Sequence, residues 1–382
     1  CAGSLRPRFL ASCESSIRAG SRIGPIEMLE LHVLGTSGSR PTRGRSVSGN
    51  YLSTPSGGIV IDCGEGFQER LLKHDLALKA TGTNKRARAS KIRAILLTHS
   101  HLDHCWGLLP FLYTMDLDGR TAPLTIIAPT AAPGSESHPD FSGLFESWRD
   151  LLSGELSKGS LGFPVEWVLI PVEGDEPIDS PVQPLEGVRL TAVPTRHGVV
   201  SLGWMVTIPE RPGRFNRKRA ASLGLTARQV SRLAGGEPVS HDGAQLDPTG
   251  FRAEVRPPCR LLVSGDTTRG VASFNQESLG GPVDLLVHEA TYTSEYHDKS
   301  VKYGHSTAAD AATAASAMGA GVLGMVHMST RIRNPDTLES EARAIHPSSF
   351  VCEDGDIIEI SSEGDIQVSR RRENAWMPLS IE

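Results

Sequence analysis

Short apolar runs separated by polar loops recur along the chain and predict its strands. Residues 29–34 alternate apolar with polar side chains before a glycine-rich turn at 35–38, which indicates a strand followed by a tight loop. Strands buried on both faces are indicated by continuous apolar runs, which occur at 95–97, 261–263, 285–287 and 322–326. Further short strands are predicted at 50–53, 59–61, 124–127, 165–170 and 188–193.

Three helices are predicted between these strands, the first of them after the loop at 62–66 and extending to residue 72. Residues 140–152 place four apolar side chains on one helical face. Residues 308–318 are rich in alanine, and Ser306 or Thr307 can cap their first turn. Strands that alternate with helices favour a layered α/β fold.

Composition excludes several classes of protein. A chain of 382 residues with 38% hydrophobic and 22% charged residues can bury a large core, so disorder is excluded as its main state. No apolar run approaches the roughly 18 residues of a membrane-spanning helix, so no membrane partner is expected. Six scattered cysteines without a CxxC pair favour reduced thiols. The net charge of −5 means that any contact with nucleic acid must be local.

Changes in composition along the chain predict its organisation. Residues 1–27 are rich in arginine and serine and resemble a transit peptide or a tail. Residues 28–372 are expected to form one domain, and residues 373–382 a C-terminal tail. Within the domain, residues 211–236 carry seven arginine and lysine residues and no acid, which indicates an inserted basic arm. The expected location is the cytoplasm, or a mitochondrion or plastid if residues 1–27 act as a transit peptide.

The most specific signal is a cluster of three histidines and an aspartate directly after the apolar run at 95–97. If this segment leads from a loop into a helix, His99 and His101 can face one cation while Asp103 and His104 face another. Two metal ions are therefore indicated. Imidazole and carboxylate ligands suit Zn²⁺ first, with Mn²⁺ or Fe as alternatives. A structural zinc site does not fit, because such sites close around one ion with four ligands, mostly cysteines.

Three further candidate ligands each follow a predicted strand: His197, Asp266 and His327. Any one of them alone could be a loop residue that caps or hydrogen-bonds its neighbours. Jointly they complete a site for two metal ions. Cys105 follows the histidine cluster directly, but the oxygen and nitrogen ligands suffice without its thiolate.

These residues resemble the metallo-β-lactamase superfamily, whose HxHxDH motif is matched at 99–104. Within that superfamily the chain is similar to the ribonuclease Z family, the endonucleases that remove 3′ trailers from precursor tRNA. Beyond the HxHxDH motif, this resemblance rests mainly on the segments at 62–66, 264–267, 288–291 (HEAT), 305–307 (HST) and 326–331. It implies a four-layer αβ/βα sandwich.

The resemblance also implies roles for the candidate residues. It assigns His99, His101 and His197 to one zinc ion, Asp103, His104 and His327 to the other, and Asp266 to a bridge between them. Asp103 would also accept a proton from a water that the two metal ions activate. We infer that Glu289 orients His305, which would donate to a phosphate oxygen or the leaving group. His288 and Asp62 are interpreted as supports.

Precursor tRNA, or another RNA, is the substrate that the resemblance implies, and a homodimer is the expected assembly. The family binds tRNA through a protruding arm, and the basic insertion lies in the corresponding place. Residues 225–228 occupy the stretch where the family has a Gly-Pro tip. The candidate RNA-binding residues are Arg214, Arg217, Lys218 and Arg219.

Two other functions remain as hypotheses. Leu102 stands where the family has a small residue, and leucine there also occurs in related cyclic-nucleotide phosphodiesterases, so the enzyme could hydrolyse small phosphodiesters. A non-catalytic RNA-binding homologue is the third hypothesis, and its ligand set would be broken. All seven ligand positions are filled here, which favours an enzyme.

Overall fold

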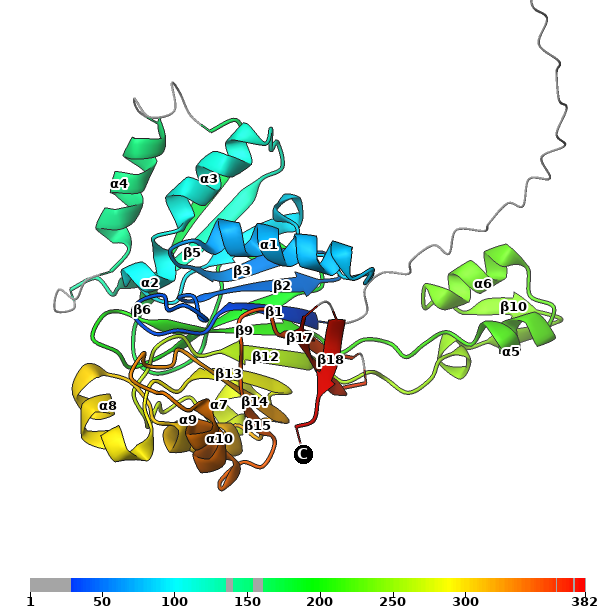
Figure 1. Ribbon diagram of the computed structural model, residues 1–382. Helices are drawn as coiled ribbons and strands as arrows, with labels where there is room; N and C mark the ends of the chain where they lie inside the picture. The colour runs from blue at the N-terminus through cyan, green and yellow to red at the C-terminus, as the bar shows by residue number, and fades with distance from the viewer. Residues whose placement is uncertain (1–28, 135–139, 154–160, 362, 374, 382) are drawn as a thin grey trace, which may run out of the picture.

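The computed structural model describes residues 29–134, 140–153, 161–361, 363–373 and 375–381. Over these ranges the chain forms two large β-sheets packed face to face, with helices on both outer sides (Figure 1). This is the four-layer αβ/βα sandwich that the resemblance implied. No helix in the described ranges combines the length and the apolar character that crossing a bilayer demands.

The first sheet has nine strands, six from residues 29–172 and three from residues 357–379. Its order is β18 (Ala375–Leu379), β17 (Ile366–Arg372), β16 (Ile357–Ile360), β1 (Leu29–Gly35), β2 (Gly49–Thr54), β3 (Gly57–Cys63), β4 (Ile92–Leu96), β5 (Leu124–Ala131) and β6 (Val165–Val172). Strands β3 to β6 run parallel, so their carboxyl ends lie at one edge of the sheet. The histidine cluster follows β4 at this edge.

The second sheet has seven strands. Its order is β15 (Ser349–Val351), β14 (Val322–Val326), β13 (Leu285–Glu289), β12 (Cys259–Val263), β9 (Leu202–Ile208), β8 (Arg189–Pro194) and β7 (Ile178–Asp179). Strands β12 to β15 are parallel. Asp266, Glu289 and His327 lie at or just beyond their carboxyl ends, as the strand-end pattern predicted.

The helices cover the outer faces of the two sheets (Figure 1). On the first sheet they are α1 (Phe67–Ala80), α3 (Leu108–Leu117) and α4 (Ser142–Ser153), with the short α2 (Leu102–Cys105) beside them. On the second sheet they are α7 (Gln276–Leu279), α8 (His297–Tyr303), α9 (Ala308–Ala317) and α10 (Pro335–Arg343). Thr307 caps α9 in a capping box with Asp310, which resolves the choice between Ser306 and Thr307.

The space between the sheets is filled by one apolar cluster drawn from both of them, including Leu31, Leu52, Leu261 and Trp204. Trp204 on β9 is fully buried, and its indole N–H donates to the backbone oxygen of Leu97 at 3.0 Å. A core side chain of the second sheet therefore fixes the backbone at Leu97, two residues before the histidine cluster begins.

A projecting arm leaves the sandwich between β9 and β12 (Figure 1). The outgoing and returning segments of the arm pair through an isolated antiparallel β-bridge between Arg211 and Arg256. The arm therefore continues beyond its expected end at residue 236. The arm contains α5 (Arg217–Ser222), α6 (Ala227–Ala234), β10 (Val239–His241) and β11 (Ala244–Leu246) around its own small apolar cluster.

The ends of the chain differ from the expected division in one respect. Residues 375–379, which were expected in a C-terminal tail, form β18 and pair with β17 at the edge of the first sheet. The tail expectation missed this strand because its apolar residues, Trp376, Met377 and Leu379, are few and half-exposed or exposed. Residues 1–27, with the expected transit peptide or tail, lie outside the described residues.

Candidate metal centre

The histidine cluster lies where the loop after β4 enters α2, and two glycines hold it there. A Cβ atom on Gly64 would come within 2.1 Å of the backbone oxygen of Asp103, and one on Gly107 within 2.2 Å of the oxygen of Gly64. Only glycine permits this close packing of the loop after β3 against α2. The backbone of the cluster is thus fixed by local sequence as well as by the sheet.

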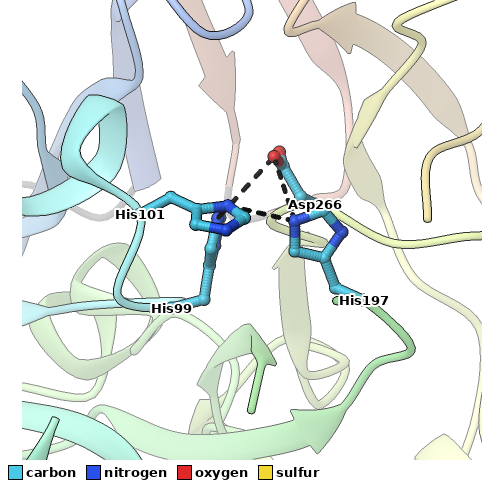
Figure 2. Close-up of side chains that lie close together, drawn as sticks. All are labelled: His99, His101, His197 and Asp266. Atoms are coloured by element: carbon cyan, nitrogen blue, oxygen red, sulfur yellow. Dashed lines mark hydrogen bonds and ion pairs between the residues drawn. The ribbon is translucent and has the colours of Figure 1, made fainter. Parts of the chain in front are cut away.

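Four side chains from three segments converge on one point, as Figure 2 shows. They are His99, His101, His197 and Asp266, and their ligand atoms all lie within 4.8 Å of one another. His101 Nδ1 lies 3.0 Å from His99 Nε2 and 3.2 Å from His197 Nε2. Asp266 Oδ2 lies 3.7 Å from His99 Nε2. The structure thus brings together the first predicted set with the predicted bridge.

The second predicted set, Asp103, His104 and His327, converges beside the first. Asp103 Oδ2 lies 3.4 Å from His327 Nε2. Asp266 reaches this set too, because its Oδ1 lies 3.4 Å from His104 Nε2 and its Oδ2 lies 3.3 Å from His327 Nε2. Asp266 therefore lies between the two sets, in the position that a bridging ligand requires.

The second nitrogen of several imidazoles is held by a neighbouring group, which fixes the orientation of each ring. These contacts join His104 Nδ1 to Asp62 Oδ2 (2.7 Å), His197 Nδ1 to Gly304 O (2.7 Å) and His327 Nδ1 to Thr291 Oγ1 (3.0 Å). The buried carboxylate of Asp62 also accepts the N–H of Thr98 at 2.9 Å. Asp62 thus acts as the support that was expected of it.

Burial and neighbouring charges shift the pKa values of the centre in different directions. Burial lowers the pKa of His99 well below its usual value, and it also lowers the pKa of His101 and His197. Burial opposes protonation of His104, but the neighbouring carboxylates, first that of Asp266, raise its pKa well above the usual value. Burial opposes ionisation of Asp266, but the positive charges of nearby histidines hold its pKa well below the usual range. A divalent cation takes neutral imidazoles and ionised carboxylates, so it would replace the proton that these carboxylates favour on His104.

Two buried polar atoms indicate that something further belongs between these side chains. His104 Nε2 and Asp266 Oδ1 are buried, and neither makes a hydrogen bond within the described part of the chain. Buried polar atoms in proteins almost always have a partner. A cation between the two atoms would satisfy both, so the residues present fit a divalent metal ion.

Glu289 and His305 form a pair at the side of the centre. Glu289 Oε1 lies 3.0 Å from His305 Nδ1, and its Oε2 accepts the hydroxyl of Thr291 at 2.7 Å. Burial opposes protonation of His305, but the charge and hydrogen bond of Glu289 raise its pKa to about 9. Because Nδ1 is held by Glu289, Nε2 is left to act as a proton donor toward the cleft.

A cleft of about 580 Å³ opens over the centre. Several of its lining residues were missed by sequence reasoning: Ser39, Arg40, Tyr292, Tyr303 and Arg331. The N–H of Ser39 donates to Asp103 Oδ2 at 2.8 Å, and this contact holds the carboxylate in place. No sequence pattern marks Ser39, Arg40 or Tyr303. Tyr292 follows the segment 288–291 and Arg331 ends the segment 326–331, and the family resemblance assigned a role to neither residue.

Cys105, which was not expected to be a ligand, His288, which was expected to be a support, and the candidate RNA-binding residues lie apart from the centre. Cys105 is buried and its thiol makes a contact of 3.6 Å with the oxygen of Ser100, and it is not among the converging ligand atoms. His288 is buried against Phe274 and its Nδ1 lies 2.6 Å from the oxygen of Glu289. The four candidate RNA-binding residues lie on the arm, which projects away from the sandwich (Figure 1).

The fold and the centre together define a metal-dependent hydrolase with the metallo-β-lactamase fold. Residues 43–202 match the model of the metallo-beta-lactamase superfamily. The structure resembles a long form RNase Z from yeast, with a TM-score of 0.58 and 17% identity over 89% of this chain and 42% of that one. It also resembles the short form of human tRNase Z, with a TM-score of 0.56 and 23% identity over 86% of this chain and 98% of that one.

Sequence comparison defines the family more closely. Ribonuclease Z of Myxococcus xanthus is 33% identical over 321 residues, which cover 83% of this chain and 93% of that protein. Ribonuclease Z of Natronomonas pharaonis is 32% identical over 336 residues, covering 87% and 98% of the two chains. The chain belongs to the ribonuclease Z family, and it is a metal-dependent nuclease.

Proposed function

We propose that the protein is an endoribonuclease that uses two zinc ions to hydrolyse the phosphodiester at the 3′ trailer of precursor tRNA. The observation that carries this proposal is the convergence of all seven predicted ligands beside the Glu289–His305 pair, at the base of an open cleft. Membership of the ribonuclease Z family supports RNA as the substrate class. The donor set of five imidazoles and two carboxylates supports zinc.

Held by the seven predicted ligands, the metal ions would supply positive charge that acidifies the attacking water and neutralises charge on the transferring phosphoryl group. The chain's own residues provide the proton transfers. The N–H of Ser39 holds the Asp103 carboxylate in place by donating to its Oδ2 at 2.8 Å, and this carboxylate can accept the proton of the attacking water. His305, protonated and oriented by Glu289, can give a proton to the departing ribose oxygen. The family resemblance favours the 3′ oxygen as the leaving group, so that the tRNA keeps a 3′ hydroxyl and the trailer carries a 5′ phosphate.

The arm supplies a basic surface outside the cleft. From Arg211 to Arg256 it has nine arginine and lysine residues against four acidic ones, in a chain whose net charge is −5. The four candidate residues differ in their surroundings. The Arg219 guanidinium lies 5.1 Å from the ring centroid of Phe251 and so helps to hold the arm together, whereas the exposed Arg217 and Lys218 on α5 are in no ion pair described for the chain.

The double variant Arg217→Gln/Lys218→Gln therefore separates RNA binding from arm stability. We expect KM for a 3′-extended precursor tRNA to rise roughly tenfold at moderate salt, and the salt dependence of binding to weaken by about two phosphate contacts. Turnover of a small chromogenic phosphodiester should be unchanged, because both residues lie outside the cleft. Steady-state kinetics on the two substrates, with the RNA products' ends mapped, is the measurement.

A matched control removes the same charge elsewhere on the surface. Lys79→Gln/Arg189→Gln changes one exposed residue at the end of α1 and one on β8, and it should leave KM for the precursor unaltered. Equal losses on RNA and on the small substrate would contradict an RNA-binding arm. Turnover of cyclic nucleotides without cleavage of the precursor would favour the small-molecule phosphodiesterase.

An exposed apolar stripe beside the centre supports the homodimer. Leu102 on α2 and Trp106, the residue directly after α2, are 57% and 51% exposed, and Tyr113 and Leu117 on α3 are 42% and 69% exposed. In each pair the two residues are four apart and so share a face. No lysine or arginine occurs at 94–119, so this surface does not attract an RNA backbone. A second copy that presents the same stripe about a two-fold axis would bury it.

The cytoplasm is the location that we propose. Its support is the similarity to ribonuclease Z of Myxococcus xanthus and of Natronomonas pharaonis, a bacterium and an archaeon. The alternative of an organelle depends on residues 1–27, which lie outside the described structure.

A further inference from the structure

The rim of the cleft carries two tyrosines whose position is fixed relative to the centre. Tyr303 is the last residue of α8 and is 54% exposed where it lines the cleft. Tyr292 lines the same cleft, and its ring centroid lies 6.2 Å from that of His305 at an angle of 67°. The described chain places no aromatic side chain over the outer face of Tyr303, since its ring contact is with the Lys302 ammonium, 5.4 Å from the ring centroid.

Tyr303 is held by the turn that connects α8 to the catalytic pair. Gly304 follows it in a left-handed conformation (φ 69°), and the Gly304 oxygen lies 2.7 Å from His197 Nδ1. A Cβ atom on Gly304 would approach His197 Nδ1 to 3.1 Å, so the turn is closely packed. His305 comes next and its N–H donates to the oxygen of Ser300 at 2.8 Å. Tyr303 therefore lies one residue from a carbonyl that orients a predicted ligand and two from His305.

Positive charge surrounds the two rings. Arg40 and Arg331 both line the cleft, and the Arg40 guanidinium donates to Thr330 Oγ1 at 3.4 Å. Neither guanidinium is in an ion pair described for the chain. Burial raises the pKa of Tyr292. The charge of Arg331 acts in the opposite direction, which means that the guanidinium lies near this tyrosine. Guanidinium groups bind a nucleotide's phosphates, and an exposed aromatic ring such as that of Tyr303 stacks on its base, while the half-buried Tyr292 lines the same cleft.

We propose that Tyr303 and Tyr292 form a subsite for the base of an unpaired nucleotide directly next to the scissile phosphate, with Arg331 and Arg40 binding the adjoining backbone phosphates. The base stacks on the exposed Tyr303 ring, and the nucleotide must leave any helical stack to reach it. The subsite thus selects a single-stranded junction for cleavage. This inference rests on the proposed function, because it assumes an RNA substrate in this cleft.

Variants of Tyr303 combined with abasic RNA test the subsite. With a normal 3′-extended precursor, Tyr303→Ala should lower kcat/KM about tenfold, within the range that loss of one base–aromatic stack produces, and Tyr303→Phe should stay within about twofold. Two further RNAs each carry one abasic nucleotide, on the 5′ or on the 3′ side of the scissile bond. The wild-type protein should cleave one of the two about tenfold more slowly than the normal precursor. On that RNA, Tyr303→Ala should have no further effect.

Two controls distinguish stacking from a structural role. Val301→Ala changes an exposed apolar residue of the same helix that does not line the cleft, and it should behave as wild type on every RNA. Tyr303 is not among the predicted ligands, so Tyr303→Ala should keep the metal content of the wild type. A loss of bound metal, or an equal loss of rate on normal RNA and on both abasic RNAs, would overturn the subsite. Failure of the wild-type protein to cleave any precursor would instead overturn the proposed function itself, and the subsite with it.

Discussion

Asp266→Ala is expected to lower the metal content and to lower kcat/KM for precursor tRNA by about 10³-fold or more. Asp266 lies between both ligand sets and is 2% exposed, and its Oδ2 approaches His99 at 3.7 Å and His327 at 3.3 Å. Without Asp266 each set keeps three ligands but loses the carboxylate that lies between them, so both sets should bind a divalent ion more weakly. Metal ions contribute several kcal/mol of transition-state stabilisation in such enzymes, which corresponds to this loss of rate.

The measurement combines steady-state kinetics with the metal content of the purified variant. Circular dichroism establishes whether the sandwich remains folded, since removal of a buried carboxylate also leaves the neighbouring imidazoles without their counter-charge. Asp179→Ala, at the exposed edge strand β7, is the matched control and should keep both metal and activity. An Asp266→Ala protein with full metal content and undiminished activity would contradict the bridging role.

His305→Ala is expected to lower kcat on RNA by about 10²- to 10⁴-fold, the usual contribution of a positioned general acid. The ribose oxygen that departs from RNA is a poor leaving group and needs the proton. A nitrophenolate leaves without one, so turnover of bis(4-nitrophenyl) phosphate should fall far less. The difference between the two substrates separates proton donation from a loss of metal or of folding.

The partner residue supplies the control for this experiment. Glu289→Gln keeps the shape of the side chain but removes the charge that favours the protonated imidazole, so its loss on RNA should have the same substrate dependence and a smaller size. Metal content should be unchanged in both variants, because neither residue belongs to the seven predicted ligands. Equal losses on the two substrates would assign His305 to metal or substrate positioning instead of proton donation.

The parts of the site that were predictable are those that local sequence specifies. His99, His101, Asp103 and His104 stand within six residues after a buried strand, and their two directions follow from a loop that enters a helix. The distant members could be predicted because each follows an apolar run. For Asp266 and His327 these runs are parallel strands, which bring their carboxyl ends to one edge, whereas His197 follows β8, which is antiparallel to its neighbour β9. Their division between two ions came from the family resemblance.

Other features depend on contacts that no short segment reveals. Tyr303 and Arg40 reach the same cleft from opposite sheets, and nothing within either segment predicts their meeting. The edge strand β18 has a weak apolar pattern because only one of its sides has a neighbouring strand. The arm was predicted from its charge and so was ended at residue 236, where the acid-free stretch stops, although the return path to Arg256 contains acids as well as cations.

The metal content of the zinc-replete wild-type protein tests the two-ion centre most directly. We predict two zinc ions per chain by elemental analysis. In a crystal structure, anomalous scattering should place one among His99, His101 and His197 and the other among Asp103, His104 and His327, with Asp266 contacting both. A single ion, or none, in protein saturated with zinc would contradict the proposed centre.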